Sequence, residues 1–217
     1  MSLVWLGCVV EGDGEVAALP LLIRRIAQRV DPGLYVQVPR PVQVKRNRLI
    51  GQFSDLQRAV ELIVRQIQAP GGILLLIDAD DDEPTVLATN LLRRLQAHRG
   101  DIPSAVAVAR REYEAWFLAA AESLRGKRGL PADLAPPADP EAVRDAKGWL
   151  RSRMPRHRKY SETIDQPALT ELFDLDLARS RSPSFEAAYR EIERLLRAIL
   201  PPAHTPDEGT SPPSGAA

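Results

Sequence analysis

The chain has 217 residues, of which 44% are hydrophobic, so it is long enough to bury one sizeable core and a small additional region. Its 29 basic and 29 acidic residues cancel, which excludes a nucleic-acid or membrane surface that covers the whole protein and leaves only local basic surfaces. The single cysteine, Cys8, excludes an intramolecular disulfide and a cysteine-based zinc cluster. No apolar stretch approaches the roughly 20 residues that span a bilayer, and no signal-peptide pattern is visible, so we expect a cytoplasmic protein without a membrane partner.

The first third of the chain predicts two strands and two helices. Residues 3–10 form a continuous apolar run, which is typical of a strand covered on both faces. A helical spacing of apolar residues follows over 15–30 and ends at a proline and glycine. Residues 35–44 alternate apolar and polar side chains, and the interruption by Pro39 and Pro41 favours an edge strand. The pattern over 54–68 predicts a second helix with Ser54 as its N-cap.

The middle of the chain repeats the alternation of strand and helix. Residues 73–77 are the most strand-like segment of the sequence, and a helix is expected from about 83 to 98. A short strand over 104–108 and a helix over 111–124 follow. This order predicts a compact, Rossmann-like α/β/α fold with three layers and a mostly parallel, four-stranded sheet over residues 1–125.

The composition changes after residue 125. Residues 126–140 are rich in glycine, proline and alanine and are expected to form a loop. Helices are expected over 145–154 and over 184–200, the latter begun by Ser182 and Pro183. We therefore expect a mostly helical accessory region over 126–200, packed on the first domain, and a disordered tail over 201–217.

Acidic residues follow two of the predicted strands at the point where each strand ends. Glu11 comes directly after the first strand, and Asp78 and Asp80 come directly after the strand over 73–77. Parallel strands bring such residues to one edge of the sheet, where carboxylates would repel each other without a cation. Oxygen ligands of this kind suit Mg²⁺ or Mn²⁺. The alternative interpretation, solvated acids of turns and helix N-termini, is preferred for four others: Asp13, Asp81, Asp82 and Glu83.

A basic segment lies in the second half of the chain, over residues 151–159. Such a segment can neutralise phosphates, which makes nucleic acid the expected partner, although a solvated charged face is the alternative. His157 within it is expected to be an exposed polar residue, whereas Trp116 and Phe117 lie in an apolar run and are expected in the core. The phosphate-binding candidates are Arg151, Arg153, Arg156, Arg158 and Lys159.

The order of these motifs resembles the Toprim domain of topoisomerases, primases and overcoming-lysogenization-defect (OLD) nucleases. The resemblance rests on a strand that ends in Glu11-Gly12, followed by Gly14-Glu15, and on a later strand that ends in Asp78-Ala79-Asp80. More closely, the chain resembles a bacterial family of unknown function related to Toprim. There the match continues through Glu112 to Trp116, Lys159-Tyr160 and Ser182 to Phe185, so that it covers roughly residues 3 to 200.

The resemblance implies a role for each matching residue. Glu11 becomes a metal ligand or general base, and Asp78 and Asp80 become Mg²⁺ ligands. Glu112 completes the site at a second metal, with an ordinary first-turn acid as the alternative. Glu15 is a helper or ligand, with an exposed helix acid as the alternative. Lys159 is expected to stabilise charge that develops during catalysis.

The predicted function is a Mg²⁺-dependent (or Mn²⁺-dependent) phosphodiesterase or nuclease that acts on nucleic acid. One alternative keeps the fold without catalysis, as a binding module that works with a partner ATPase or with nucleic acid. A second alternative is a dinucleotide-binding protein, since Gly12-x-Gly14-x-x-Ala17 follows a strand and opens a helix. Glu11, Asp13 and Glu15 argue against it because they crowd the loop that a pyrophosphate would occupy.

Overall fold

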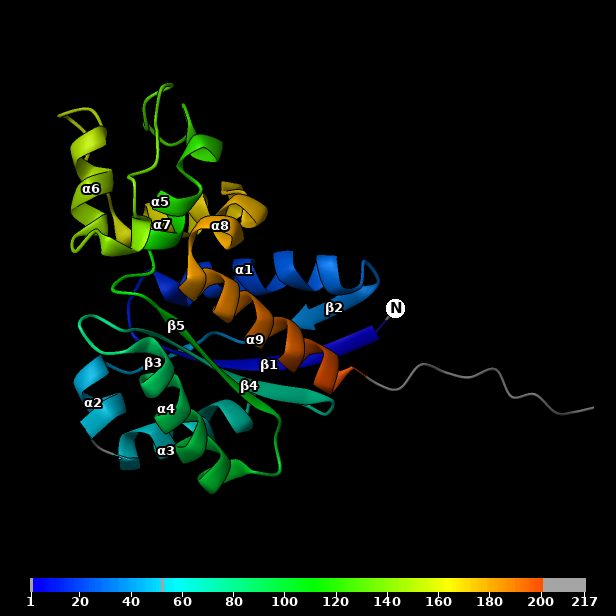
Figure 1. Ribbon diagram of the computed structural model, residues 1–217. Coiled ribbons are helices and arrows are strands. Elements are labelled where there is room, and N and C mark those ends of the chain that lie inside the picture. Colours follow the sequence, from blue (N-terminus) through cyan, green and yellow to red (C-terminus); the bar gives the residue numbers. More distant parts are fainter. Residues whose placement is uncertain (1, 52, 201–217) are drawn as a thin grey trace, which may run out of the picture.

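A parallel five-stranded sheet forms the centre of the protein in a computed structural model that describes residues 2–51 and 53–200. The strand order is β2-β1-β4-β5, and the short β3 pairs with β1 beyond the end of β2 (Figure 1). Every pairing is parallel, so the predicted fold class is confirmed with one strand more than expected. The strands are β1 (Ser2–Val10), β2 (Leu34–Gln37), β3 (Val42–Gln43), β4 (Gly71–Asp78) and β5 (Ser104–Ala109).

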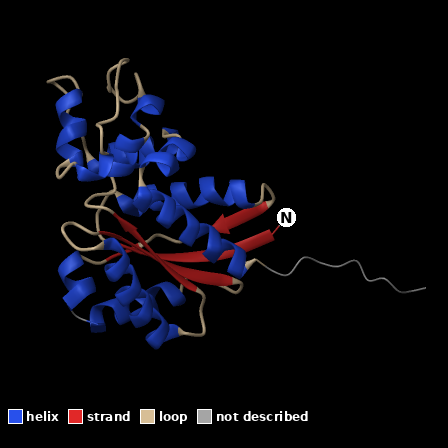
Figure 2. Ribbon diagram, in the orientation of Figure 1, coloured by secondary structure: helices blue, strands red, loops and turns tan. Residues whose placement is uncertain are grey.

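The sheet is covered by helices on both faces, as Figure 2 shows. Alternate residues of β4 point to opposite sides: Leu74 and Leu76 pack under α1 (Glu15–Val30) and α9 (Pro183–Ile199). Ile73 and Leu75 pack under α3 (Phe53–Val64) and α4 (Pro84–Arg99). Because side chains alternate along a strand, an apolar run such as β4 can be buried only between two layers.

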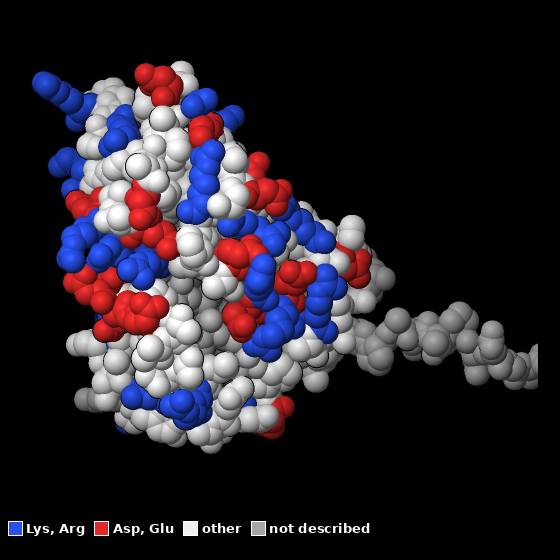
Figure 3. Space-filling view, viewed as in Figure 1, with Lys and Arg blue, Asp and Glu red and all other residues white. Residues whose placement is uncertain are grey.

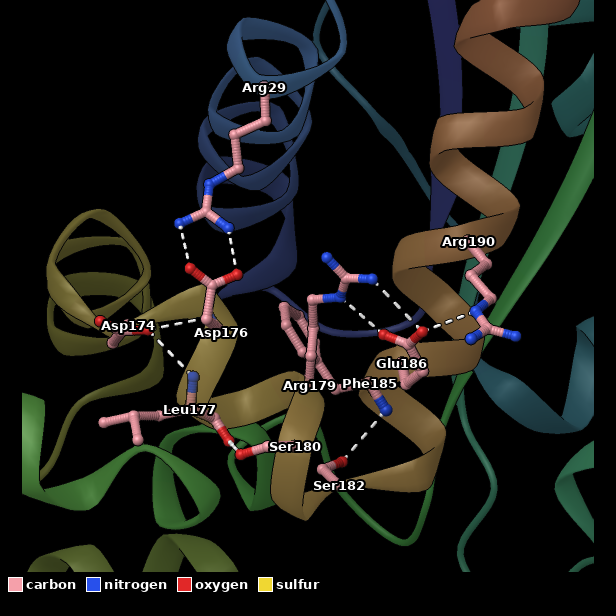
Figure 4. Close-up of polar contacts among 10 residues, drawn as sticks. All are labelled: Arg29, Asp174, Asp176, Leu177, Arg179, Ser180, Ser182, Phe185, Glu186 and Arg190. Carbon is pink, nitrogen blue, oxygen red and sulfur yellow. Dashed lines mark hydrogen bonds and ion pairs between the residues drawn. The ribbon is translucent and has the colours of Figure 1, made fainter.

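The helix α9 packs along β5 and against α1, so the end of the chain completes one face of the sheet (Figure 1). Its buried side chains include Phe185, Ile192 and Leu196, each of which contributes about 1.5–3 kcal/mol by leaving water. The Ser182 hydroxyl accepts a hydrogen bond from the Phe185 N–H at 3.0 Å and thereby caps the helix, which confirms the predicted start (Figure 4).

The region between β5 and α9 consists of short helices. The prediction of one helix over 111–124 was wrong, because the backbone turns at Arg111 (φ 62°) and the helix begins only at Ala115. Figure 4 shows Arg29 of α1 binding Asp176 of α8, which ties this region to a helix that covers one face of the sheet. The elements are α5 (Ala115–Ala119), η1 (Ala121–Leu124), η2 (Pro140–Ala142), α6 (Ala146–Arg153), α7 (Glu162–Leu172) and α8 (Leu175–Arg181).

One further difference from the sequence prediction concerns local structure. An additional helix, α2 (Arg46–Gly51), lies between β3 and α3. The predicted disordered tail over 201–217 lies outside the described residues. Among residues 2–51 and 53–200, no helix is long and apolar enough to cross a membrane. Trp116 and Phe117 are completely buried, as predicted for core residues.

Candidate functional site

Two carboxylates lie where the neighbouring strands β1 and β4 end. Glu11 follows the last residue of β1, and Asp78 is the last residue of β4. The two strands pair directly, with Val9 opposite Leu75. The sequence predicted that parallel strands would bring these two carboxylates to one edge of the sheet, and the structure shows β1 and β4 as direct neighbours there.

Asp78 is nearly buried, and its side chain is fixed by the backbone of the next strand's turn. The Tyr113 N–H donates a hydrogen bond to Asp78 Oδ1 at 2.9 Å. Burial first, and then the charges of Glu15 and Glu114, raise the pKa of Asp78 well above its ordinary value. Asp78 is thus a carboxylate that lies among other carboxylates away from water.

Glu15, the first residue of α1, is buried to 4% exposure, so the alternative of an exposed helix acid is wrong. Its Oε2 atom accepts a hydrogen bond from the Gly12 N–H at 2.6 Å. A Cβ at Gly14 would lie only 1.8 Å from Gln166 Oε1, so the absence of a side chain there lets α7 approach this turn. The two glycines therefore shape a turn that encloses the Glu15 carboxylate.

Glu114 is completely buried and was assigned no role by the sequence analysis. The Tyr160 hydroxyl donates to Glu114 Oε1 at 2.8 Å, whereas Glu114 Oε2 has no hydrogen-bond partner among the described residues. Burial is the main cause that raises the pKa of Glu114 to about 7. Its place in the sequence could have indicated its burial, since it directly precedes a run of seven apolar residues, 115–121, all of which are buried.

Glu11, Glu15, Asp78 and Glu114 form what we call the carboxylate cluster. Burial first, and then the charges of Glu15 and Asp80, raise the pKa of Glu11. The Oε2 atom of Glu11 is buried and has no hydrogen-bond partner among the described residues. Buried carboxylate oxygens without donors are costly, and a cation is the partner that would compensate them.

Lys147 of α6 is the positive charge that lies among these acids. Its Nζ atom is 3.4 Å from Glu162 Oε1, and its side chain is 26% exposed. Burial alone would lower the pKa of Lys147, but the charges of Glu114 and Asp78 outweigh burial and raise it. Lys147 could not be predicted as part of the site, because nothing in the local pattern of α6 indicates that it faces the sheet edge.

Glu112 holds the start of α6 in place. Its Oε2 atom accepts a hydrogen bond from the Lys147 N–H at 3.1 Å. This contact engages one oxygen of the residue that was predicted to complete the site at a second metal. Glu112 therefore also positions the backbone from which the Lys147 side chain extends.

The aspartates that follow β4, which we call the aspartate turn (Asp80, Asp81 and Asp82), are bound by arginines. Arg46 Nε lies 3.0 Å from Asp80 Oδ2, and Arg46 also binds Asp82. Arg46 donates to the backbone carbonyl oxygen of Asp78 at 2.6 Å as well, so it fixes the end of β4. Asp80, predicted as a metal ligand, is 59% exposed and already ion-paired.

The ligand atoms of the carboxylate cluster suit a hard divalent cation, but their present positions do not form a complete metal site. All its donor atoms are oxygens, two of them lack hydrogen-bond donors, and the acids repel one another. Among residues 2–51 and 53–200, however, no three His, Cys, Asp or Glu side chains converge closely enough to hold a metal ion as they stand. Binding would require side chains of the cluster to reorient.

The basic segment over residues 151–159 is mostly exposed, and part of it is engaged elsewhere. Arg158 binds Asp165 at 2.6 Å, and the Arg153 guanidinium lies 3.5 Å from the centre of the Trp149 ring. Lys159, predicted to be catalytic, is exposed, as is His157. Arg151 and Arg156 are exposed as well, so these two and Lys159 can contact the phosphates of a nucleic-acid backbone.

The glycine turn after β1 is poorly suited to a pyrophosphate. The Gly12 N–H, one of the donors that a dinucleotide would need there, already binds the Glu15 carboxylate. A buried negative charge at the start of α1 also opposes an anion at this helix end. These contacts argue further against a dinucleotide-binding protein.

Comparison with protein families matches residues 10–193 to the domain of unknown function DUF4276. The chain belongs to this family. The match includes every member of the carboxylate cluster, the aspartate turn and the basic segment, so these features lie within the DUF4276 domain. Comparisons with curated proteins and with solved structures gave no match.

Proposed function

We propose that this DUF4276 protein is a Mg²⁺-dependent or Mn²⁺-dependent phosphodiesterase that acts on nucleic acid and is related to Toprim nucleases. The observation that carries the proposal is the carboxylate cluster at the ends of β1 and β4, with raised pKa values and two buried oxygens that lack donors. A divalent cation is the simplest partner that would relieve both the repulsion and the missing contacts.

Glu11 and Asp78 are the residues that we expect to hold the cation, with Glu15 and Glu114 as further oxygen donors. Asp80 becomes available to the cation only if it leaves Arg46. When bound, such a cation polarises a phosphoryl oxygen and lowers the pKa of a bound water. Glu112, the predicted ligand of a second metal, has one oxygen engaged by the Lys147 N–H.

The protein's own residues supply the surroundings for this chemistry. The Tyr113 N–H fixes one oxygen of Asp78 and leaves the other free, while the Tyr160 hydroxyl does the same for Glu114. Lys147 holds a positive charge beside the cluster, where it can stabilise negative charge on a phosphate. The exposed part of the basic segment, including Lys159, is proposed to bind the nucleic-acid backbone.

A non-catalytic binding module that works with nucleic acid or a partner ATPase is the second candidate. The ion pair between Arg46 and Asp80 favours it, because it engages one of the acids that a nuclease would use. The two functions differ in their dependence on the cluster: binding of nucleic acid by a module would not need Glu11 or Asp78.

The test is cleavage of labelled DNA and RNA by the purified protein with Mg²⁺ or Mn²⁺, compared with Glu11→Gln and Asp78→Asn. The proposal predicts metal-dependent cleavage that either substitution lowers at least about 100-fold, since each removes a charged ligand. Asp13→Asn is the matched control, because Asp13 lies two residues from Glu11 but is 64% exposed. Cleavage that persists in both cluster variants would refute the assignment, and a lack of cleavage with intact nucleic-acid binding would favour the module.

A further inference from the structure

Two arginines from distant parts of the chain meet at one exposed carboxylate beside the candidate site. Arg111, just after β5, donates to Asp81 Oδ1 at 2.7 Å, and Arg144, just before α6, lies 3.3 Å from the same atom. The three side chains line a surface pocket of about 300 Å³ together with Asp80 and Glu112. Figure 3 shows acidic and basic side chains interleaved at the left edge of the molecule, where β4 and β5 end.

The backbone that presents these side chains is in an unfavourable conformation at two linked positions. Asp80 and Arg111 both have positive φ, at 50° and 62°. The Asp80 N–H donates to the Arg111 carbonyl oxygen at 3.2 Å, so the two turns support each other. Glycine would adopt this conformation at about 1 kcal/mol lower cost, so both turns hold their side chains at the pocket at a small cost in backbone conformation.

The ion pairs to Asp81 are easily exchanged. The side chains of Asp81 and Arg144 are each 72% exposed, whereas that of Arg111 is only 19% exposed. Exposed ion pairs contribute little to stability, so Asp81 can leave at small cost. Two guanidinium groups that share one carboxylate oxygen present more donors than that carboxylate can use, and a phosphoryl group offers more oxygens and more charge.

We propose that Arg111 and Arg144 form a binding subsite for a phosphoryl group, and that Asp81 occupies this subsite in the free protein. The inference extends the proposed function, because the pocket adjoins the carboxylate cluster. Glu112 lines the pocket and accepts a hydrogen bond from the Lys147 N–H, and the Lys147 side chain lies among the acids of the cluster. A phosphodiester held by the two arginines would lie next to the candidate cation site. Asp81 thereby acts as an internal competitor of the substrate.

The experiment measures binding of a fluorescent single-stranded oligonucleotide, and its displacement by inorganic phosphate, in EDTA so that no cleavage occurs. Arg144→Gln and Arg111→Asn should each weaken oligonucleotide binding about three- to tenfold. Asparagine is chosen for position 111 because it tolerates positive φ, so that this variant keeps the turn. Asp81→Asn should tighten binding about threefold by removing the competitor.

Glu193→Gln is the matched control for Asp81→Asn, because it frees Arg197 from an exposed ion pair on α9. Equal effects of these two variants, or unchanged affinity in Arg144→Gln and Arg111→Asn, would overturn the subsite. If phosphate displaces the oligonucleotide from the wild-type protein but not from Arg144→Gln, the phosphoryl group itself is recognised. If phosphate displaces the oligonucleotide equally from the wild type, Arg144→Gln and Arg111→Asn, the subsite is contradicted. The binding assay contains no metal, so its result is independent of the cleavage assay. The subsite can be refuted even if metal-dependent cleavage is found, and it can be supported even if no cleavage is found.

Discussion

The side chain of Glu114 shows how a single buried carboxyl group can control the stability of the metal-free protein. Its pKa is raised to about 7 from the ordinary 4.5. Between these values the folded protein binds more protons than the unfolded chain, so the free energy of unfolding falls as pH rises through this window. The contribution of Glu114 has an upper bound of about 3 kcal/mol.

We therefore predict that the protein in EDTA is more stable near pH 5 than near pH 7.5, as measured by urea unfolding. Glu114→Gln should flatten this dependence, because glutamine keeps an acceptor for the Tyr160 hydroxyl without a titrating group. Glu11, Glu15 and Asp78 have raised pKa values as well, so a residual slope of the same sign should remain. Stability that rises over this interval would contradict the described burial of the cluster.

Lys147 and Lys159 provide a direct comparison between the structure and the sequence analysis. Lys147→Met removes the cation that lies among Glu114, Asp78 and Glu162. We expect it to lower the free energy of unfolding by about 1–3 kcal/mol at pH 7.5, less than a fully buried pair would lose because the side chain is partly exposed. Lys159→Met is the control and should change stability little. Equal losses in the two variants would show that Lys147 does not neutralise the cluster.

At the scale of elements, the start of α9 depends on one hydroxyl group. Ser182 Oγ accepts from the Phe185 N–H at 3.0 Å and donates to the buried Glu141. Ser182→Ala should therefore destabilise the protein by about 1–2 kcal/mol in chemical unfolding. Ser161 occupies the same position before α7 but makes no capping hydrogen bond with its side chain. Ser161→Ala should thus be nearly neutral, and a similar cost at both sites would contradict the described cap.

The contact between α1 and α7 depends on Gly14. A Cβ there would lie 1.8 Å from Gln166 Oε1 and 2.8 Å from the Glu162 carbonyl oxygen, which belongs to the backbone and cannot simply rotate away. We expect Gly14→Ala to lower the melting temperature by an amount that corresponds to about 1–3 kcal/mol. Gly51→Ala is the control, because nothing lies within 4 Å of the added Cβ. A neutral Gly14→Ala would indicate that α7 does not approach the turn as closely as described.

The elements also show what local sequence can and cannot predict. The strands β1 and β4 and the start of α9 were predicted, since continuous apolar runs and a Ser-Pro cap depend on local chemistry. The helix expected from Arg111 was wrong, because two linked turns with positive φ take priority over helix propensity there. Similarly, the Ser-Pro start predicted the helix over 184–200 but not that β5 and α1 would be its partners.

At the scale of the whole molecule, the candidate site combines both halves of the chain. Glu11 and Asp78 come from the sheet and could be predicted, because strand order alone brings strand ends together. Lys147 and Tyr160 come from the region after β5 and reach the cluster only through tertiary packing. Sequence spacing cannot choose between Lys147 and Lys159, since both lie near the same basic segment and only the position of α6 distinguishes them.

The measurement that tests the central claim most directly is a Mn²⁺ titration followed by electron paramagnetic resonance. We predict saturable Mn²⁺ binding by the wild-type protein and by Asp13→Asn, and a loss of at least tenfold in Mn²⁺ affinity in Glu11→Gln and Asp78→Asn. Both cluster variants should remain folded, because each keeps the size of the side chain and lowers the repulsion among the remaining acids. Wild-type protein that binds no Mn²⁺, or cluster variants that bind it as tightly as Asp13→Asn does, would contradict the assignment of a cation site to these carboxylates.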